Sequence, residues 1–236
     1  MFDSTRRAFL HRSAFGLATI GASGLILRCD AAPTQQIDRA GGDRVVIHMN
    51  PGQGANIAPS GELKKVTPVT YGPFYRAGAP FRGKLSVPGE PGTTFVLSGR
   101  VWAYETKRPV PGAVLDFWHV DNSEKYSNGT TDLRNRGRVI SSETGYYEVE
   151  GIRPIPYRPN PGGTPEFWRC AHFHLAVFAP GYQPLVTEIH FQGDAKRNDP
   201  MYRPENAIAV EAKNVNGTKF ETGVFDVVLE RENSAK

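Results

Sequence analysis

Two histidines stand two residues apart in the apolar run "RCAHFHLAV", where only Phe173 separates His172 from His174. If this run is a β-strand, successive side chains point to opposite faces, so the two imidazoles share one face and the apolar side chains share the other. Neutral imidazoles held in a fixed geometry are ligands for iron, copper, zinc or nickel. The competing interpretation is a strand whose polar face is only solvated.

Two tyrosines lie outside the expected strands. Tyr126 follows a strand in "DFWHVDNSEKYSNG", and Tyr157 lies in "IRPIPYRPNPGG", where prolines stiffen the loop. A tyrosine in a loop of fixed geometry can present its hydroxyl to a ligand, although packing in the core is its usual role. Along the chain, these residues and the histidines occur in the order Tyr126, Tyr157, Arg169, His172, His174.

The elements that must position these residues are short strands. From Thr94 onward, β-branched and aromatic runs alternate with turns rich in Gly, Pro, Asn and Asp, and no amphipathic helix is indicated among them. The runs are "TFVLSGRVWAY", "GAVLDFWHV", "GRVIS", "GYYEVEGI", "AHFHLAVFA", "LVTEIHFQG", "AIAVEA" and "GVFDVVLE", with a hairpin turn at residues 143–145. The pattern predicts one all-β domain, a sandwich or barrel, over residues 67–236.

Residues 1–32 have the features of an export signal. Arg6 and Arg7 form a twin-arginine pair in "STRRAFL", and the apolar segment from Ala14 to Leu27 is too short for a membrane span. We expect a Tat-type signal peptide, a periplasmic or extracellular location and no stable membrane anchor. Residues 33–66 are expected to form an extended N-terminal arm with one strand in "RVVIHMN".

Composition narrows the classes of partner. The 236 residues carry a formal net charge of +4 without a basic block, so neither nucleic acid nor an anionic membrane surface is indicated. Once residues 1–32 are removed, Cys170 is the only cysteine, and no disulfide can form within the chain. Twin-arginine export suits proteins that fold, and often load a cofactor, before they cross the membrane.

Taken together, these motifs resemble the intradiol ring-cleavage dioxygenases, and within that family most closely the protocatechuate 3,4-dioxygenase type. The likeness runs from about Thr67 to Pro200, through "TPVTYGPFYR", "PVPGAVLDFWHVDNSEKY", "RGRVISSETGYYEVEGIRPIPY", "FWRCAHFH" and "TEIHFQGD". It implies a β-sandwich of mixed sheets with long loops carrying the metal site. It also implies that O2 cleaves a catechol-type aromatic diol to a cis,cis-muconate-type diacid.

By this resemblance, Tyr126, Tyr157, His172 and His174 are the ligands of one mononuclear non-haem Fe(III), and Tyr157 is the axial ligand that the substrate displaces. The chemistry of the donors agrees. A phenol titrates at about pH 10 in water, so it binds as phenolate at neutral pH only beside a strongly charged cation. Hard anionic oxygen donors favour the ferric ion. Arg169 matches a family arginine that stabilises developing negative charge.

Two departures from the family pattern concern the substrate. Cys170 stands where the family usually has proline, and Glu188 in "TEIHF" stands where glutamine is common. Glu188 could pair with Arg169 and weaken its attraction for an anionic substrate. Glu188 and Tyr75, in "GPFYR", are expected to contact the substrate. The resemblance leaves catechol, protocatechuate, hydroxyquinol and bulkier catechols open.

The remaining histidines and two tryptophans are expected to be structural. His48, His119 and His190 are not at ligand positions, and Trp118 and Trp168 are expected to pack around the site.

Two other functions are alternatives to the dioxygenase. "GRVWAYETKRPVPGAVLDF" and "TGYYEVEGI" also resemble transthyretin-like or carbohydrate-binding sandwich modules, which are not enzymes and have no need of Tyr157, Arg169, His172 and His174 in series. A copper or zinc protein that uses the histidine pair is the third hypothesis, and the two tyrosines argue against it. Association into a homodimer is the working hypothesis.

Overall fold

The computed structural model describes residues 36–38, 46–48, 62–129, 133–163, 167–194 and 199–232. Among these residues, helical structure is limited to the short 3-10 turn η2 (Pro204–Asn206). The strands are β1 (Gln36–Asp38), β2 (Val46–His48), β3 (Thr94–Ala103), β4 (Val114–Trp118), β5 (Arg136–Ile140), β6 (Tyr146–Ile152), β7 (His172–Phe178), β8 (Leu185–Phe191), β9 (Ala207–Ile208), β10 (Glu211–Val215), β11 (Thr218–Val224) and β12 (Val227–Leu229).

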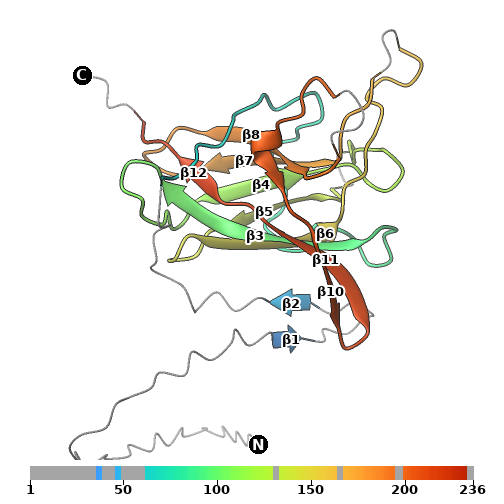
Figure 1. Ribbon diagram of the computed structural model, residues 1–236, viewed down its shortest axis with the longest axis horizontal. Helices are drawn as coiled ribbons and strands as arrows, with labels where there is room; N and C mark the ends of the chain where they lie inside the picture. The colour runs from blue at the N-terminus through green and yellow to red at the C-terminus, as the bar shows by residue number, and fades with distance from the viewer. Residues whose placement is uncertain are drawn as a thin grey trace, which may run out of the picture. The chain divides into compact units, whose positions relative to one another are not determined.

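The strands from β3 onward form two five-stranded sheets (Figure 1). One sheet has the order β5-β4-β7-β8-β9 and is antiparallel except for the parallel β8–β9 pair. In the other sheet, β11 and β12 both pair in parallel with β3, whereas β6 pairs with β3 in the antiparallel sense and β10 with β11 likewise. Both sheets are therefore mixed. β1 and β2 form a separate antiparallel pair.

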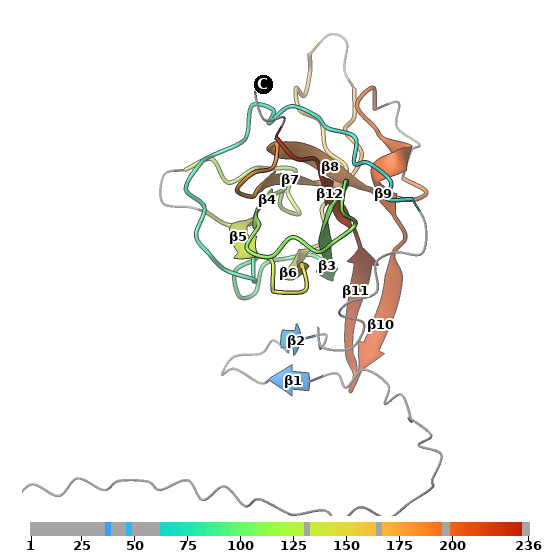
Figure 2. The ribbon, with the colours of Figure 1, turned by 90° about the vertical axis from the view of Figure 1, so that its left-hand side faces the viewer.

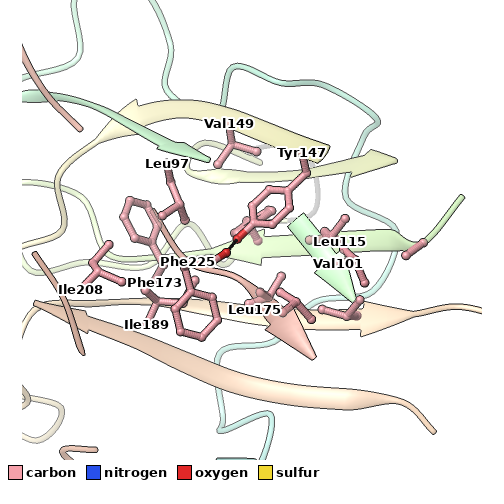
Figure 3. Close-up of a cluster of buried hydrophobic side chains, with 14 of the residues drawn as sticks. Leu97, Val101, Leu115, Tyr147, Val149, Phe173, Leu175, Ile189, Ile208 and Phe225 are labelled. Atoms are coloured by element: carbon pink, nitrogen blue, oxygen red, sulfur yellow. Dashed lines mark hydrogen bonds between the residues drawn. The ribbon is translucent and has the colours of Figure 1, made fainter. Parts of the chain in front are cut away.

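The two sheets pack face to face as a sandwich (Figure 2). Alternate residues of each strand point inward, and Figure 3 shows how Leu97 of β3, Leu115 of β4, Val149 of β6 and Leu175 of β7 meet between the sheets. Such alternation is what a period of two residues in a strand requires. The hydroxyl of Tyr147 donates to the carbonyl oxygen of Phe225 at 2.5 Å, so this buried phenol is hydrogen-bonded.

β7 is the central strand of its sheet, between β4 and β8. Its inward side chains, Phe173, Leu175 and Val177, belong to the core, and His172 and His174 occupy the other face. Both histidines are buried as well, at 2% and 3% exposure. The interpretation of a merely solvated polar face is therefore wrong, because loops cover this face of the sheet.

The all-β sandwich of mixed sheets predicted from the sequence is confirmed. The turn expected at residues 143–145 joins β5 to β6, with Gly145 at a φ of +72°. In the predicted arm, β2 lies inside the expected strand, and Leu63 packs against Trp102 and Val228. The predicted signal peptide, residues 1–32, lies outside the described residues. Within the described part of the chain, no helix has the length and apolar character needed to cross a membrane.

Candidate metal centre

Two loops and one strand bring the predicted ligands together. His172 and His174 are the first and third residues of β7. Tyr126 lies in the loop that follows β4, and Tyr157 lies in the loop that follows β6. The Tyr157 loop is tied to the start of β7 by two backbone hydrogen bonds with Arg169, of 3.1 and 2.8 Å. Long loops thus supply the oxygen donors, and the strand supplies the nitrogen donors.

The donor atoms of these four residues form one cluster. His172 Nε2 lies 3.2 Å from His174 Nε2, which lies 3.0 Å from the hydroxyl of Tyr126. The hydroxyls of Tyr126 and Tyr157 are 3.3 Å apart. The structure therefore brings together all four residues that the sequence singled out as ligands.

Burial sets the protonation of the two histidines. Desolvation lowers the pKa of His172 to about 4 and that of His174 well below its ordinary value. Both imidazoles are therefore neutral at pH 7. The Nδ1 atom of His172 lies 2.6 Å from the carbonyl oxygen of Cys170, to which it donates, so its Nε2 carries a lone pair and not a proton. That lone pair points into the cluster.

Burial acts on the tyrosines in the opposite sense. Desolvation raises the pKa of Tyr126 well above its ordinary value, and the neighbouring Tyr157 raises it further. Burial also raises the pKa of Tyr157, although the hydrogen bond with Tyr126 and the charge of Arg169 oppose the shift. Without a cation both phenols stay protonated at neutral pH. Two nitrogen lone pairs and two phenol oxygens at contact distance fit a metal ion, which would stabilise the phenolates.

Aromatic neighbours hold the ligands in place. The indole of Trp118 stacks on the imidazole of His174, with ring centroids 4.8 Å apart and planes 3° from parallel. The ring of Phe74 stacks on Tyr126 with centroids 4.4 Å apart. Trp118 therefore packs around the site, as predicted. At Trp168, the guanidinium of Arg158 lies over the ring, 5.3 Å from its centroid.

Arg169 and Glu188 form a buried ion pair beside the cluster. Arg169 precedes β7, and the chain bends there, so its side chain reaches Glu188 with Nη2 2.6 Å from Oε2. The other carboxylate oxygen lies 3.6 Å from His174 Nδ1 and 3.8 Å from His172 Nε2. Burial opposes ionisation of Glu188, but His190 Nε2, 3.4 Å from Oε2, and the charge of Arg169 hold its pKa well below the ordinary range.

Asp199 is a site residue that the sequence did not reveal. Its Oδ2 atom lies 3.1 Å from Arg169 Nε and accepts the backbone N–H of Cys170 at 2.9 Å. No periodicity or motif marks an aspartate in the loop "KRNDPMY", so only the tertiary structure identifies it. His119 and His190 are buried outside the four-donor cluster, and the side chain of His48 lies outside the described residues.

A cavity of about 480 Å³ opens beside the cluster. Tyr157, Arg169, His174 and Glu188 line it on the side of the donors. Apolar residues make most of the remaining wall, and these are Pro68, Val69, Pro73, Phe74, Pro159, Phe167 and Met201. The polar edge and apolar walls are those of a small-molecule site.

Tyr75, which is expected to contact the substrate, is not among the residues that line this cavity. Phe74 lines the cavity, whereas the hydroxyl of Tyr75 donates to Asp116 Oδ2 at 3.3 Å. The ring of Tyr75 also packs against Trp118 and Tyr71. This hydrogen bond turns its hydroxyl toward β4, and contact between Tyr75 and the substrate stays a prediction.

Comparison with known proteins adds to this geometry. Residues 71–231 match the family model described as Dioxygenase. A chlorocatechol 1,2-dioxygenase of Rhodococcus opacus is 33% identical over 181 residues, which cover 67% of this chain and 70% of the relative. A catechol 1,2-dioxygenase of Pseudomonas sp. (strain EST1001) is 32% identical over 179 residues, which cover 67% of this chain and 59% of the relative.

Solved structures share the fold. The catechol 1,2-dioxygenase of Pseudomonas arvilla C-1 matches with a TM-score of 0.65 and 27% identity over 71% of this chain and 62% of that chain. A dioxygenase domain from a dioxygenase carbohydrate-binding protein fusion of Streptomyces sp. SirexAA-E matches with a TM-score of 0.59 and 26% identity, over 72% of this chain and 100% of that chain. The chain thus spans less than two thirds of some relatives that it matches.

The mixed β-sandwich and the family match across most of it define the class of protein. The chain belongs to the intradiol ring-cleavage dioxygenase family. The relatives described above carry catechol and chlorocatechol names, so the closer likeness to the protocatechuate type stays a prediction.

Proposed function

We propose that the protein is an Fe(III)-dependent intradiol dioxygenase. It cleaves the bond between the two hydroxylated carbons of a catechol and incorporates both atoms of O2, giving a cis,cis-muconate-type diacid. The convergence of Tyr126, Tyr157, His172 and His174 into one cluster is the observation that carries this proposal. A non-enzymatic sandwich module has no use for such a cluster.

The donor set supports ferric iron over other metals. Two phenolate oxygens are hard anionic donors, and they are produced at neutral pH only by a cation of high charge. Tyr126, Tyr157, His172 and His174 would hold the ion. When bound, Fe(III) supplies chelation of both catechol oxygens and makes the ring electron-rich enough to react with dioxygen.

The cavity residues orient the substrate. Phe74, Phe167 and Met201 offer apolar surface to a single aromatic ring and exclude water from it. Tyr157 lines this cavity and Tyr126 does not, although both tyrosines line a second hollow of about 530 Å³. Tyr157 is thus the tyrosine that the substrate would meet, and as a phenolate it would take the proton of one catechol hydroxyl. This supports Tyr157 as the ligand that gives way to the substrate.

Arg169 is the cationic group of the cavity wall that lies beside the donors. Its guanidinium can stabilise negative charge that develops on the ring oxygens, because the site is buried and water does not screen it. Two carboxylates, Glu188 and Asp199, share that charge.

We further propose that the chain is exported through the Tat pathway and acts in the periplasm or outside the cell. Its partners are then a small aromatic diol and O2, and it neither binds nucleic acid nor keeps a stable membrane anchor. The twin-arginine motif in residues 4–10 supports this proposal. Assembly into a homo-oligomer is proposed on symmetry grounds alone.

Product analysis tests the proposed reaction. Iron-loaded protein is incubated with catechol under ¹⁸O2, and the product is examined by mass spectrometry. We expect a ring-opened diacid that carries two ¹⁸O atoms, and no such product from Tyr157→Phe or His172→Ala at comparable rates. Unchanged catechol, or a product with one labelled oxygen, would contradict the proposal.

A further inference from the structure

The guanidinium of Arg169 is shared between two carboxylates. Its Nη2 lies 2.6 Å from Glu188 Oε2, and its Nε lies 3.1 Å from Asp199 Oδ2. None of the three side chains is more than 7% exposed. One buried cation therefore faces two buried anions, and the group as a whole is negatively charged.

Asp199 anchors this group from behind the cavity wall. Besides Arg169, its Oδ2 accepts the N–H of Cys170 at 2.9 Å, and its Oδ1 accepts the N–H of Met201 at 2.8 Å. These bonds fix the carboxylate and the guanidinium bound to it. Of the two acids, Glu188 is the one that lines the cavity.

Glu188 presents its second oxygen to the donor cluster. It stands opposite His174 in the register of β7 and β8, so both side chains lie on the same face of the sheet. With Oε2 held by Arg169, Oε1 lies 3.6 Å from His174 Nδ1 and 3.8 Å from His172 Nε2. A ring bound at the cluster would therefore meet an anionic oxygen at the cavity wall.

The rest of the wall offers an anionic ring substituent little compensation. Most of it is apolar, including Phe74, Phe167 and Met201. Arg203, the second cation among the lining residues, is partly exposed, so water screens its charge, and its Nη1 donates to the backbone carbonyls of Pro200 and Tyr202 at 3.3 and 3.1 Å. A carboxylate on the ring would lose its hydration and approach Glu188 without gaining Arg169.

We infer that Glu188 determines which catechols the site accepts: by cancelling the charge of Arg169, it disfavours rings with an anionic substituent and favours neutral or cationic rings. The inference rests on the proposed function and names the substrate class of the same site. Glu188 acts by charge at short range in a buried cavity, where such effects are strongest.

Three catechols that differ in charge test this inference. They are 3,4-dihydroxybenzoate, 4-methylcatechol and 4-(2-aminoethyl)catechol, which are anionic, neutral and cationic at neutral pH. The dissociation constant of each is measured anaerobically on iron-loaded protein, from the change in its visible spectrum, and kcat/KM is measured in air. For the unaltered protein we expect the anionic compound to bind at least about tenfold more weakly than the neutral one.

The isosteric variant Glu188→Gln removes the charge and keeps the shape. We expect it to reduce the preference for the neutral over the anionic compound by about tenfold and to weaken binding of the cationic one. Glu211→Gln is the matched control. It removes the same charge from β10, where Glu211 is exposed and paired with Lys213 at 2.6 Å, and it should leave all ratios unchanged.

The outcomes separate this inference from the proposed function. Equal binding of the anionic and neutral compounds by the unaltered protein would overturn the role of Glu188, and this comparison needs no variant. Equal shifts in Glu188→Gln and Glu211→Gln would also overturn it, because they would show an effect of net charge alone. If the unaltered protein neither binds nor cleaves any of the three compounds, the proposed function itself fails and the inference fails with it.

Discussion

Single residues of the site are prepared by their surroundings before a metal binds. Burial keeps His172 and His174 neutral, and the Cys170 carbonyl directs the lone pair of His172 toward the cluster. The same burial raises the pKa of Tyr126 and Tyr157, so their phenols are harder to ionise. A metal ion would stabilise both tyrosinates and release their protons, so metal binding is coupled to the protonation of the site.

Trp118 is predicted to position His174 through ring stacking. Trp118→Leu removes the stacked indole, and we expect iron affinity to fall on the order of tenfold, as for loss of other groups that orient a ligand. Iron is titrated into the apoprotein and followed by its visible absorption. Trp102→Leu is the control, because Trp102 packs in a separate cluster with Leu63 and Val228. Equal losses in both variants would indicate general destabilisation and contradict the positioning role.

Asp116 is predicted to make the fold less stable as pH rises. Burial raises the pKa of Asp116 to about 6, against the hydrogen bond from Tyr75 and the charges of Arg138 and Arg136. Because the folded chain binds this proton more tightly than the unfolded chain, stability from Asp116 is complete below about pH 4 and is lost as pH rises through about 6.

Asp116→Asn should therefore stabilise the protein above pH 6, by up to about 3 kcal/mol relative to its effect at pH 4. The free energy of unfolding by urea, measured for both proteins from pH 4 to 7.5, gives this difference directly. A difference that does not change with pH would refute the assignment to Asp116.

At the scale of elements, the site is built across three neighbouring strands. Trp118 of β4, His174 of β7 and Glu188 of β8 stand in register on one face of the sheet. The loops after β4 and β6 then add the tyrosines. The rigid sheet therefore fixes the two histidine donors, and the loops add the two tyrosine donors beside them.

Gly99 is predicted to be essential to the opposite sheet. Between β11 and β12 the chain passes close against β3, so a Cβ at Gly99 would overlap the Phe225 carbonyl that accepts the Tyr147 hydroxyl. We expect Gly99→Ala to lower the free energy of unfolding by about 3 kcal/mol. Gly83→Ala is the control, since its Cβ would come no closer than 3.8 Å to a neighbour and should change stability by less than about 0.5 kcal/mol. Similar losses in both would contradict the packing described.

The site residues that lie on strands could be predicted from the sequence, whereas those that lie in loops could be predicted only in part. A period of two residues puts His172 and His174 on one face, and the short apolar runs predict the sandwich. Tyr126 and Tyr157 were singled out by their places in loops and by family resemblance. Asp199 and the turn of Tyr75 toward Asp116 could not be foreseen, because both depend on where distant loops lie in the folded chain.

At the scale of the whole molecule, a folded, metal-binding sandwich agrees with the route of export proposed for it. A chain that folds around a metal before crossing the membrane needs a pathway for folded proteins, and the Tat pathway proposed from Arg6 and Arg7 is one. Cys170 is buried, and its thiol donates to the backbone carbonyl of Asp194 at 3.2 Å, so the described fold uses this thiol in its reduced form.

The twin-arginine proposal predicts the location of the protein. Replacing both Arg6 and Arg7 by lysine keeps the positive charge and should retain the protein in the cytoplasm of a bacterial host, uncleaved. Immunoblots of cell fractions, with Arg12→Lys as the control, measure the distribution. Export of the doubly substituted chain at the normal level would contradict the proposal.

The central claim, that two tyrosinates and two histidines hold ferric iron beside a catechol site, is tested most directly by the visible absorption spectrum of the iron-loaded protein with and without catechol under anaerobic conditions. We predict a broad tyrosinate-to-iron band and a red-brown colour, a shift of the band in Tyr126→Phe, and a move to longer wavelength when catechol binds. A protein that stays colourless with iron and catechol would contradict the account and favour the non-enzymatic sandwich.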